Sequence, residues 1–155
     1  MSFRIRGLNF EPFRSLVDMP DDELRTRGAR RILADQVPGY PDRIELRDAE
    51  PGESLLLVNY VHQTAASPYR ASHAVYVLER PARTYEKVDE VPSVLRCRVI
   101  SLRAFDDEGM IVAADLCAGT AVEQSIEQLL HIAGVSYLQP HYAKYGCYAC
   151  RADRA

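Results

Sequence analysis

Two histidines, a tyrosine and an arginine lie within one short stretch of the chain, HQTAASPYRASH at 62–73. Imidazole can donate or accept a proton near neutral pH, and a guanidinium binds carboxylate or phosphate through paired hydrogen bonds. The flanking apolar runs are typical of strands, so we expect a ten-residue loop at 63–72. Long loops in compact domains are more often functional than short ones. The alternative is a solvated hairpin loop whose Arg70 makes a weak surface ion pair.

The predicted site is a pocket for a small anionic molecule at one end of a sheet. Arg70 would bind the anionic group, and a histidine would act as its acid–base partner because its pKa lies near the working range. The expected ligand-binding residues are Tyr60, His62, Tyr69, Arg70 and Tyr145. The expected catalytic residues are His73, His141 and Cys147. Both a small enzyme and a simple binding protein fit this pattern.

A metal-dependent hydrolase using His62, His73 and His141 is a further alternative, because catalytic zinc takes three protein ligands and keeps one open position. The chain has no His-Glu-x-x-His motif and no paired cysteine knuckle, which are the spacings that predict such a site. We therefore predict neither a metal nor a cofactor.

The pair C-Y-A-C at 147–150 resembles a redox motif only in its spacing. A thioredoxin-type cysteine needs a helix N-terminus after it, and too few residues follow here to form that helix. Cys147 remains a possible nucleophile if a base approaches it, and the alternative is an inert buried thiol.

Composition narrows the class of partner. The formal net charge is −3, which gives no electrostatic reason to expect nucleic acid. The longest aliphatic run, Leu55 to Val58, is far shorter than the ~20 residues of a membrane-spanning helix. We expect a cytoplasmic protein with reduced cysteines. A non-enzymatic homodimer is the rival to the pocket, because Tyr and Arg also dominate protein interfaces.

Apolar periodicity and turn residues predict one α+β domain over 1–155, a mostly antiparallel sheet with one main helix and short N-terminal helices. The main helix is expected at 120–133, where Thr120 and Glu123 have capping-box spacing. Shorter helices are expected at 9–17, 20–28 and 92–96. Strands are expected at 3–8, 29–35, 43–49, 54–62, 73–79, 97–105, 110–117, 135–141 and 146–152.

Six phrases in chain order resemble a bacterial family catalogued as domain of unknown function 1203. They are GYPDR (39–43), DAEPGE (48–53), NYVHQ (59–63), SPYRASH (67–73), RAFDDEGM (103–110) and AKYGCYA (143–149). The resemblance implies a small single-domain bacterial protein and no particular activity. Two positions depart from the family pattern: Gln139 stands where a histidine is usual, and Asp42 where a cysteine is usual.

Overall fold

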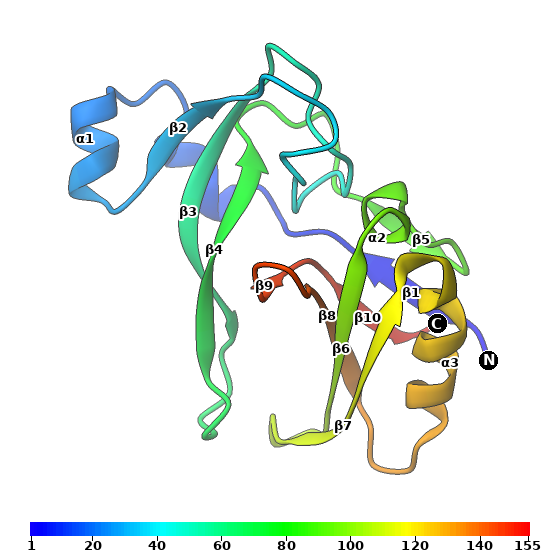
Figure 1. Cartoon of the computed structure of the whole chain (residues 1–155). Helices are drawn as coiled ribbons and strands as arrows, with labels where there is room; N and C mark the ends of the chain where they lie inside the picture. The colour runs from blue at the N-terminus through cyan, green and yellow to red at the C-terminus, as the bar shows by residue number, and fades with distance from the viewer.

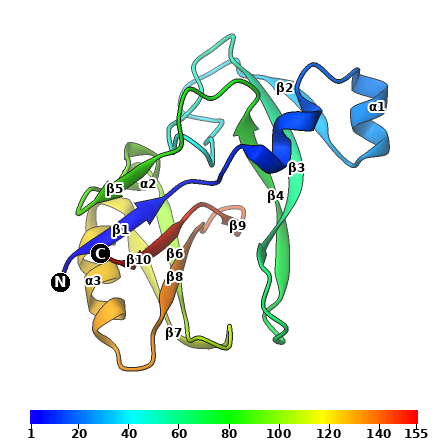
Figure 2. The same ribbon diagram turned by 180° about the vertical axis from the view of Figure 1, so that it is seen from behind.

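A seven-stranded antiparallel sheet forms the larger half of the protein, seen in a computed structural model that describes all of residues 1–155. Its hydrogen-bonded order is β5-β1-β10-β8-β6-β7, with β9 pairing on β8. The strands are β1 (Phe3–Arg6), β5 (Glu86–Val88), β6 (Val99–Phe105), β7 (Ile111–Ala118), β8 (Tyr137–Tyr142), β9 (Cys147–Tyr148) and β10 (Arg151–Arg154). β1 pairs with β10, so the two termini lie side by side (Figures 1 and 2).

A second, three-stranded sheet stands beside the first (Figure 1). It consists of β2 (Arg30–Leu33), β3 (Ser54–Gln63) and β4 (Ala71–Leu78), in that order. β-branched and aromatic side chains are abundant in β3 and β4, as expected for half-buried strands. Their hairpin brings Tyr60 opposite His73. This pairing places the histidine-bearing ends of both strands next to the large sheet.

Helix α3 (Val122–His131) covers the face of the large sheet that lies away from the small sheet (Figures 1 and 2). Its buried residues follow helical spacing and join the main core cluster: Val122, Ile126, Leu129 and Leu130. The remaining helical segments are η1 (Glu11–Leu16), α1 (Asp21–Thr26), α2 (Ser93–Arg96) and η2 (Gly119–Ala121). The predicted α+β fold with antiparallel sheets is confirmed.

A second core cluster joins the two sheets. It packs Phe13 and Leu24 of the N-terminal segments against Val58 and Val75 of the small sheet. Tyr148 of β9 belongs to the same cluster although β9 is part of the large sheet. β9 accordingly lies between the two sheets in both views (Figures 1 and 2). The C-terminal segment therefore helps to position one sheet against the other.

The predicted strand at 43–49 is wrong. The Asp42 carboxylate accepts hydrogen bonds from the backbone N–H groups of Ile44 and Glu45, and Leu46 adopts a φ of +53°. A side chain that binds the N–H groups ahead of it competes with strand pairing. The segment instead forms a buried loop, because Asp42 also accepts a hydrogen bond from Leu78 N–H.

Two smaller predictions also fail. The capping box at 120–123 does not form, because α3 has Ala121 at its N-cap and Glu123 pairs with Arg96 at 2.8 Å. The loop between β3 and β4 is shorter than ten residues, because pairing continues to Gln63 opposite Ala71. No helix in the structure has both the length and the hydropathy to cross a membrane.

Candidate functional site

A pocket of about 930 Å³ opens where the two sheets and the loop before β3 meet. That loop, in cyan in Figure 1, lies between the small sheet and α2. Its lining comes from residues 36–43 of the loop, the edge of β4, the start of β6 and the turn from β8 to β9. None of the 16 lining residues is Asp or Glu, whereas three carry a permanent positive charge: Arg43, Arg98 and Lys144.

Arg43 is the most unusual member of the lining because it is only 1% exposed. Its guanidinium donates to the carbonyl oxygens of Tyr148 at 2.8 Å and Pro41 at 2.5 Å, and to Cys147 Sγ at 3.0 Å. None of these three acceptors is a carboxylate. A buried charge is costly unless it is paired, and Arg keeps its charge at any physiological pH. This guanidinium therefore carries a positive charge that the protein leaves uncompensated.

Tyr142 lies beside Arg43 and Arg98 in the pocket wall. The guanidinium carbons of the two arginines are 4.9 and 5.2 Å from its ring centroid, which is cation–π distance. Arg98 is compensated by Asp48, with a shortest contact of 2.6 Å. The Tyr142 hydroxyl is buried without a hydrogen-bond partner. Burial raises the pKa of Tyr142 well above its ordinary value, so the phenol stays neutral.

The turn after β8 brings the third cation to the pocket. Gly146 has a φ of +74°, a conformation that glycine adopts without strain, and its N–H bonds to Tyr142 O at 2.8 Å. The turn places Lys144, Tyr145 and Cys147 in the lining. Lys144 and Tyr145 are exposed, so they stand at the mouth of the pocket.

Behind the pocket wall, His73 and His62 form a hydrogen-bonded chain that ends at Gln139. His73 Nδ1 is 2.8 Å from His62 Nε2, and His62 Nδ1 is 2.7 Å from Gln139 Oε1. The Gln139 amide nitrogen donates to the His62 carbonyl, which orients its oxygen toward the ring. His62 must therefore donate from Nδ1 and accept at Nε2. It follows that His73 donates from Nδ1 and retains an unprotonated Nε2.

His141 lies against both of these rings. Its ring centroid is 4.9 Å from that of His62 and 5.5 Å from that of His73. Its Nδ1 donates to Gly146 O at 3.1 Å, which leaves Nε2 buried and without a partner. Burial, reinforced by the nearby charge of Arg103, lowers the pKa of His141 to about 3. Burial likewise lowers the pKa values of His62 and His73, so all three rings are neutral at pH 7.

The histidine cluster is not arranged as a metal site. No group of three or more His, Cys, Asp or Glu side chains could hold a metal ion. Two of the expected ligand atoms, His62 Nε2 and His73 Nδ1, point at one another across a 2.8 Å hydrogen bond. Nitrogens bound to zinc at ~2.0–2.1 Å in tetrahedral geometry would stand further apart and point at the metal.

The structure places the expected site residues in three groups. His73, Tyr145 and Cys147 line the pocket. His62 stacks on His73, and His141 meets both rings edge-on. Tyr60 packs between Phe13 and Tyr148 instead of lining the pocket. Tyr69 and Arg70 lie elsewhere, on the exposed loop after β3.

Arg70 therefore cannot be the anion-binding arginine of this pocket. Its guanidinium donates to Thr64 O at 2.6 Å, which closes the loop on itself. The loop is fastened to the large sheet through Ser67 Oγ, which donates to Gly109 O, and through Gln63, which donates to the Tyr137 hydroxyl. Its polar residues thus hold the hairpin against the turn between β6 and β7.

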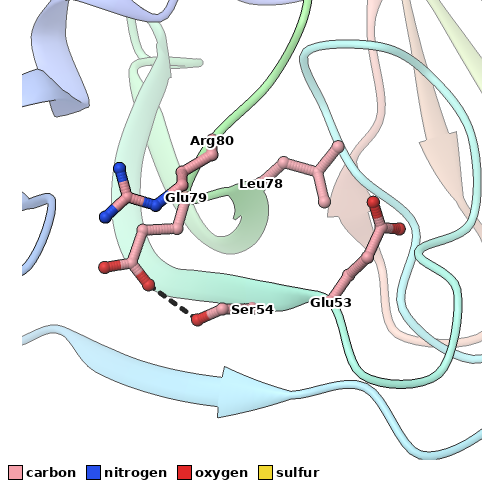
Figure 3. Close-up of a pocket in the computed structure, with 5 residues that line it drawn as sticks. All are labelled: Glu53, Ser54, Leu78, Glu79 and Arg80. Atoms are coloured by element: carbon pink, nitrogen blue, oxygen red, sulfur yellow. Dashed lines mark hydrogen bonds between the residues drawn. The ribbon is translucent and has the colours of Figure 1, made fainter.

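A second, smaller hollow near the start of β3 is lined by Glu53, Ser54, Leu78, Glu79 and Arg80 (Figure 3). The Glu79 carboxylate in it accepts from Ser54 Oγ at 2.6 Å, from Arg31 and from the Asp18 N–H. Burial alone would raise the pKa of Glu79, but the Arg31, Ser54 and Asp18 hydrogen bonds outweigh it and lower the pKa to about 2. We infer that this cluster around Glu79 stabilises the fold and is not a ligand site.

None of the three cations of the pocket, Arg43, Arg98 and Lys144, is among the residues predicted from the sequence. A signal was present, because two of the six family phrases, GYPDR and AKYGCYA, supply Arg43 and Lys144. A third phrase, SPYRASH, supplies His73. The first and the last of the six family segments therefore both line this pocket.

The fold and the site together define an α+β protein with a cationic pocket beside two antiparallel sheets. The family model described as "Protein of unknown function (DUF1203)" matches residues 39–154. The chain belongs to this family, which confirms the resemblance seen in the sequence. A search of curated proteins and a search of solved structures found no match.

Proposed function

We propose that the pocket binds a small anionic molecule, with Arg43 as the central contact to its negative charge. The observation that carries the proposal is the uncompensated guanidinium of Arg43 in a lining without carboxylates. Removing a charge from water costs several kcal/mol when no partner repays it. An anionic ligand in the pocket supplies the missing negative charge while the guanidinium keeps its three hydrogen bonds within the protein.

The other two cations add to this attraction in different ways. Lys144 at the mouth raises the local concentration of anions, a long-range effect that salt screens. Arg98 has its charge shared with Asp48, so it contributes less than Arg43. The pocket volume of about 930 Å³ suits a metabolite-sized ligand.

We assign the acid–base role in this site to His73. It is the one histidine in the lining, and the hydrogen bonds behind it leave its Nε2 free to accept a proton. Burial lowers the pKa of His73, which keeps it in the basic form at neutral pH. An enzyme acting on an anionic substrate is therefore favoured over a protein that only binds one.

Thermal unfolding tests the binding of anions. We would compare phosphate, sulfate and succinate with chloride at constant ionic strength. A ligand at 100 times its Kd stabilises the folded state by about 2.7 kcal/mol, which raises the Tm of a domain this size by several degrees. The chain offers a matched pair of variants because its two lysines are Lys144, at the mouth, and Lys87, exposed on β5.

Lys144→Glu should weaken the anion-dependent rise in Tm, whereas Lys87→Glu, with the same change in net charge, should preserve it. Equal effects of the two variants, or no anion that raises the Tm above the chloride value, would contradict the proposal.

A further inference from the structure

We propose that Cys147 is a nucleophile that captures the bound anion covalently. The inference rests on the proposed function, because the pocket must first concentrate the anion. It names the substrate class: a small oxyanion, either a carboxylate or a phosphate ester, that carries an electrophilic carbon. The supporting observations are a hydrogen bond to the sulfur, an unpartnered hydroxyl in the same wall and a base in the same lining.

The Arg43 guanidinium fixes the position of the Cys147 sulfur. Nη2 donates to Sγ at 3.0 Å, while the rest of the guanidinium is held by backbone carbonyls. The sulfur is thus the one side-chain acceptor of this buried cation. Reactive cysteines are found in such electropositive, partly exposed surroundings, and Cys147 is partly exposed in the pocket.

The other three cysteines lack this combination. Cys150 is fully buried, and burial raises its pKa to about 12. Cys117 is outside the lining, and burial raises its pKa as well. Cys97 lines the pocket and accepts from Arg98 Nη1 at 3.2 Å, but the same nitrogen also donates to Asp48. Because Asp48 compensates that guanidinium, its positive charge is less available to the Cys97 sulfur.

The same wall contains a buried polar group without a partner. The Tyr142 side chain is 3% exposed and lines the pocket, yet its hydroxyl has no hydrogen-bond partner. Buried hydroxyls in proteins are rarely left unpaired. Tyr142 lies directly opposite Cys147 in the pairing of β8 with β9. The hydroxyl without a partner therefore belongs to the cross-strand neighbour of Cys147.

The covalent step is a displacement at carbon. The Cys147 sulfur forms a bond to the electrophilic carbon, and the leaving group departs with the electron pair of its bond. The thiol proton passes to Nε2 of His73, directly or through a water molecule, which is the cysteine–histidine arrangement of nucleophilic catalysis. Arg43 remains hydrogen-bonded at the site and neutralises the oxyanion of the adduct.

Alkylation of the unmodified wild-type protein tests the proposal, with iodoacetate as the anionic reagent and iodoacetamide as its neutral counterpart. Intact mass follows the rate, and peptide mapping identifies the cysteine modified. The ratio of the iodoacetate rate to the iodoacetamide rate is compared with that of an uncharged cysteine peptide. We expect Cys147 to react first, with a ratio about tenfold or more above that of the peptide.

Four variants assign the roles. Lys144→Glu should lower the ratio at Cys147, and Lys87→Glu should leave it unchanged. His73→Gln should slow both reagents equally, because the proton acceptor acts on the sulfur and not on the charge of the reagent. Cys147→Ser should abolish the fast phase.

Modification of Cys97 before Cys147 would overturn the inference, as would a ratio at Cys147 equal to that of the peptide. The thermal-unfolding experiment separates the two claims. If anions raise the Tm in the Lys144-dependent manner while Cys147 fails either criterion, the proposed binding function stands and the nucleophile does not. If neither response occurs, both fail.

Discussion

Nη2 of Arg43 lies 3.0 Å from Sγ of Cys147, although 104 residues separate the two in the chain. The contact joins the loop before β3 to the strand that links the sheets. It places a buried, uncompensated positive charge beside a thiol in a pocket that contains no carboxylate. Both the proposed anion binding and the proposed nucleophilic reaction depend on these two residues.

Replacing Arg43 with methionine should abolish most of the affinity for anions. Hydrogen bonds to charged groups contribute about 1.5–3 kcal/mol each, so Kd should rise by ten- to a hundredfold. Isothermal titration with the anion that raises Tm most measures this loss. Arg70→Ala is the matched control, because Arg70 bonds only to Thr64 O outside the pocket. Loss of binding in the control variant instead would place the anion on the exposed loop.

Buried neutral histidines should make the protein less stable as the pH falls below 6.5. Burial lowers the pKa of His141 from 6.5 to about 3, so the unfolded chain binds more protons within this window. The free energy of unfolding should then decrease by about 1.4 kcal/mol per pH unit from this residue, and His62 and His73 contribute with the same sign.

Urea unfolding at several pH values between 5 and 7 measures this slope above the range where the carboxylates titrate. His141→Phe should reduce the slope. A slope that is the same in the wild type and His141→Phe would show that His141 is not the group responsible.

Glu79→Gln should destabilise the fold without affecting the pocket. Glu79 is 4% exposed and accepts three hydrogen bonds from the Arg31 side chain at 2.9–3.2 Å. Removing one partner of a buried ion pair costs roughly 3–5 kcal/mol. Glu23→Gln, which breaks only an exposed pair with Arg27, should cost about 0.5 kcal/mol or less. Chemical denaturation measures the free energy of unfolding of both variants. Similar losses of stability would mean that the buried Glu79 ion pair does not stabilise the fold more than an exposed pair does.

The prediction of the fold succeeds where local pattern decides and fails where tertiary contacts do. The residue types of β3 and the apolar stripe on α3 predict both elements directly from the sequence. The stretch at 43–49 has strand-like residues, but Asp42 captures its N–H groups. The Asp42 carboxylate is also held by the backbone N–H of Leu78, and no local sequence pattern relates these two residues.

At the candidate site, too, residue type is readable from the sequence and tertiary packing is not. His73 and Cys147 were recognisable as chemically capable residues, and the fold brings both to one pocket. Arg43 was overlooked because its importance lies in burial without a counter-charge, which only the packed structure reveals. Arg70 lies near the histidines in sequence, yet its loop contacts the β6–β7 turn.

Gly109→Ala should loosen the attachment of the β3–β4 loop. Gly109 has a φ of +76°, and a Cβ there would lie 2.3 Å from the Ala65 Cβ. Both the backbone strain and the clash oppose the substitution, so we expect a loss of about 1–3 kcal/mol. Hydrogen exchange should increase most around residues 64–70. Unchanged exchange in that loop would mean that it is not held by the turn.

A small anion should bind at Arg43, and amide chemical shifts measured during a phosphate titration locate the binding site residue by residue. We predict saturable shifts, with one common Kd, at Gly39, Tyr145 and Cys147, and none around Arg70 in the β3–β4 loop. Sodium chloride at the same ionic strength should not reproduce them. Shifts confined to the β3–β4 loop, or none that saturate, would contradict the assignment of this pocket.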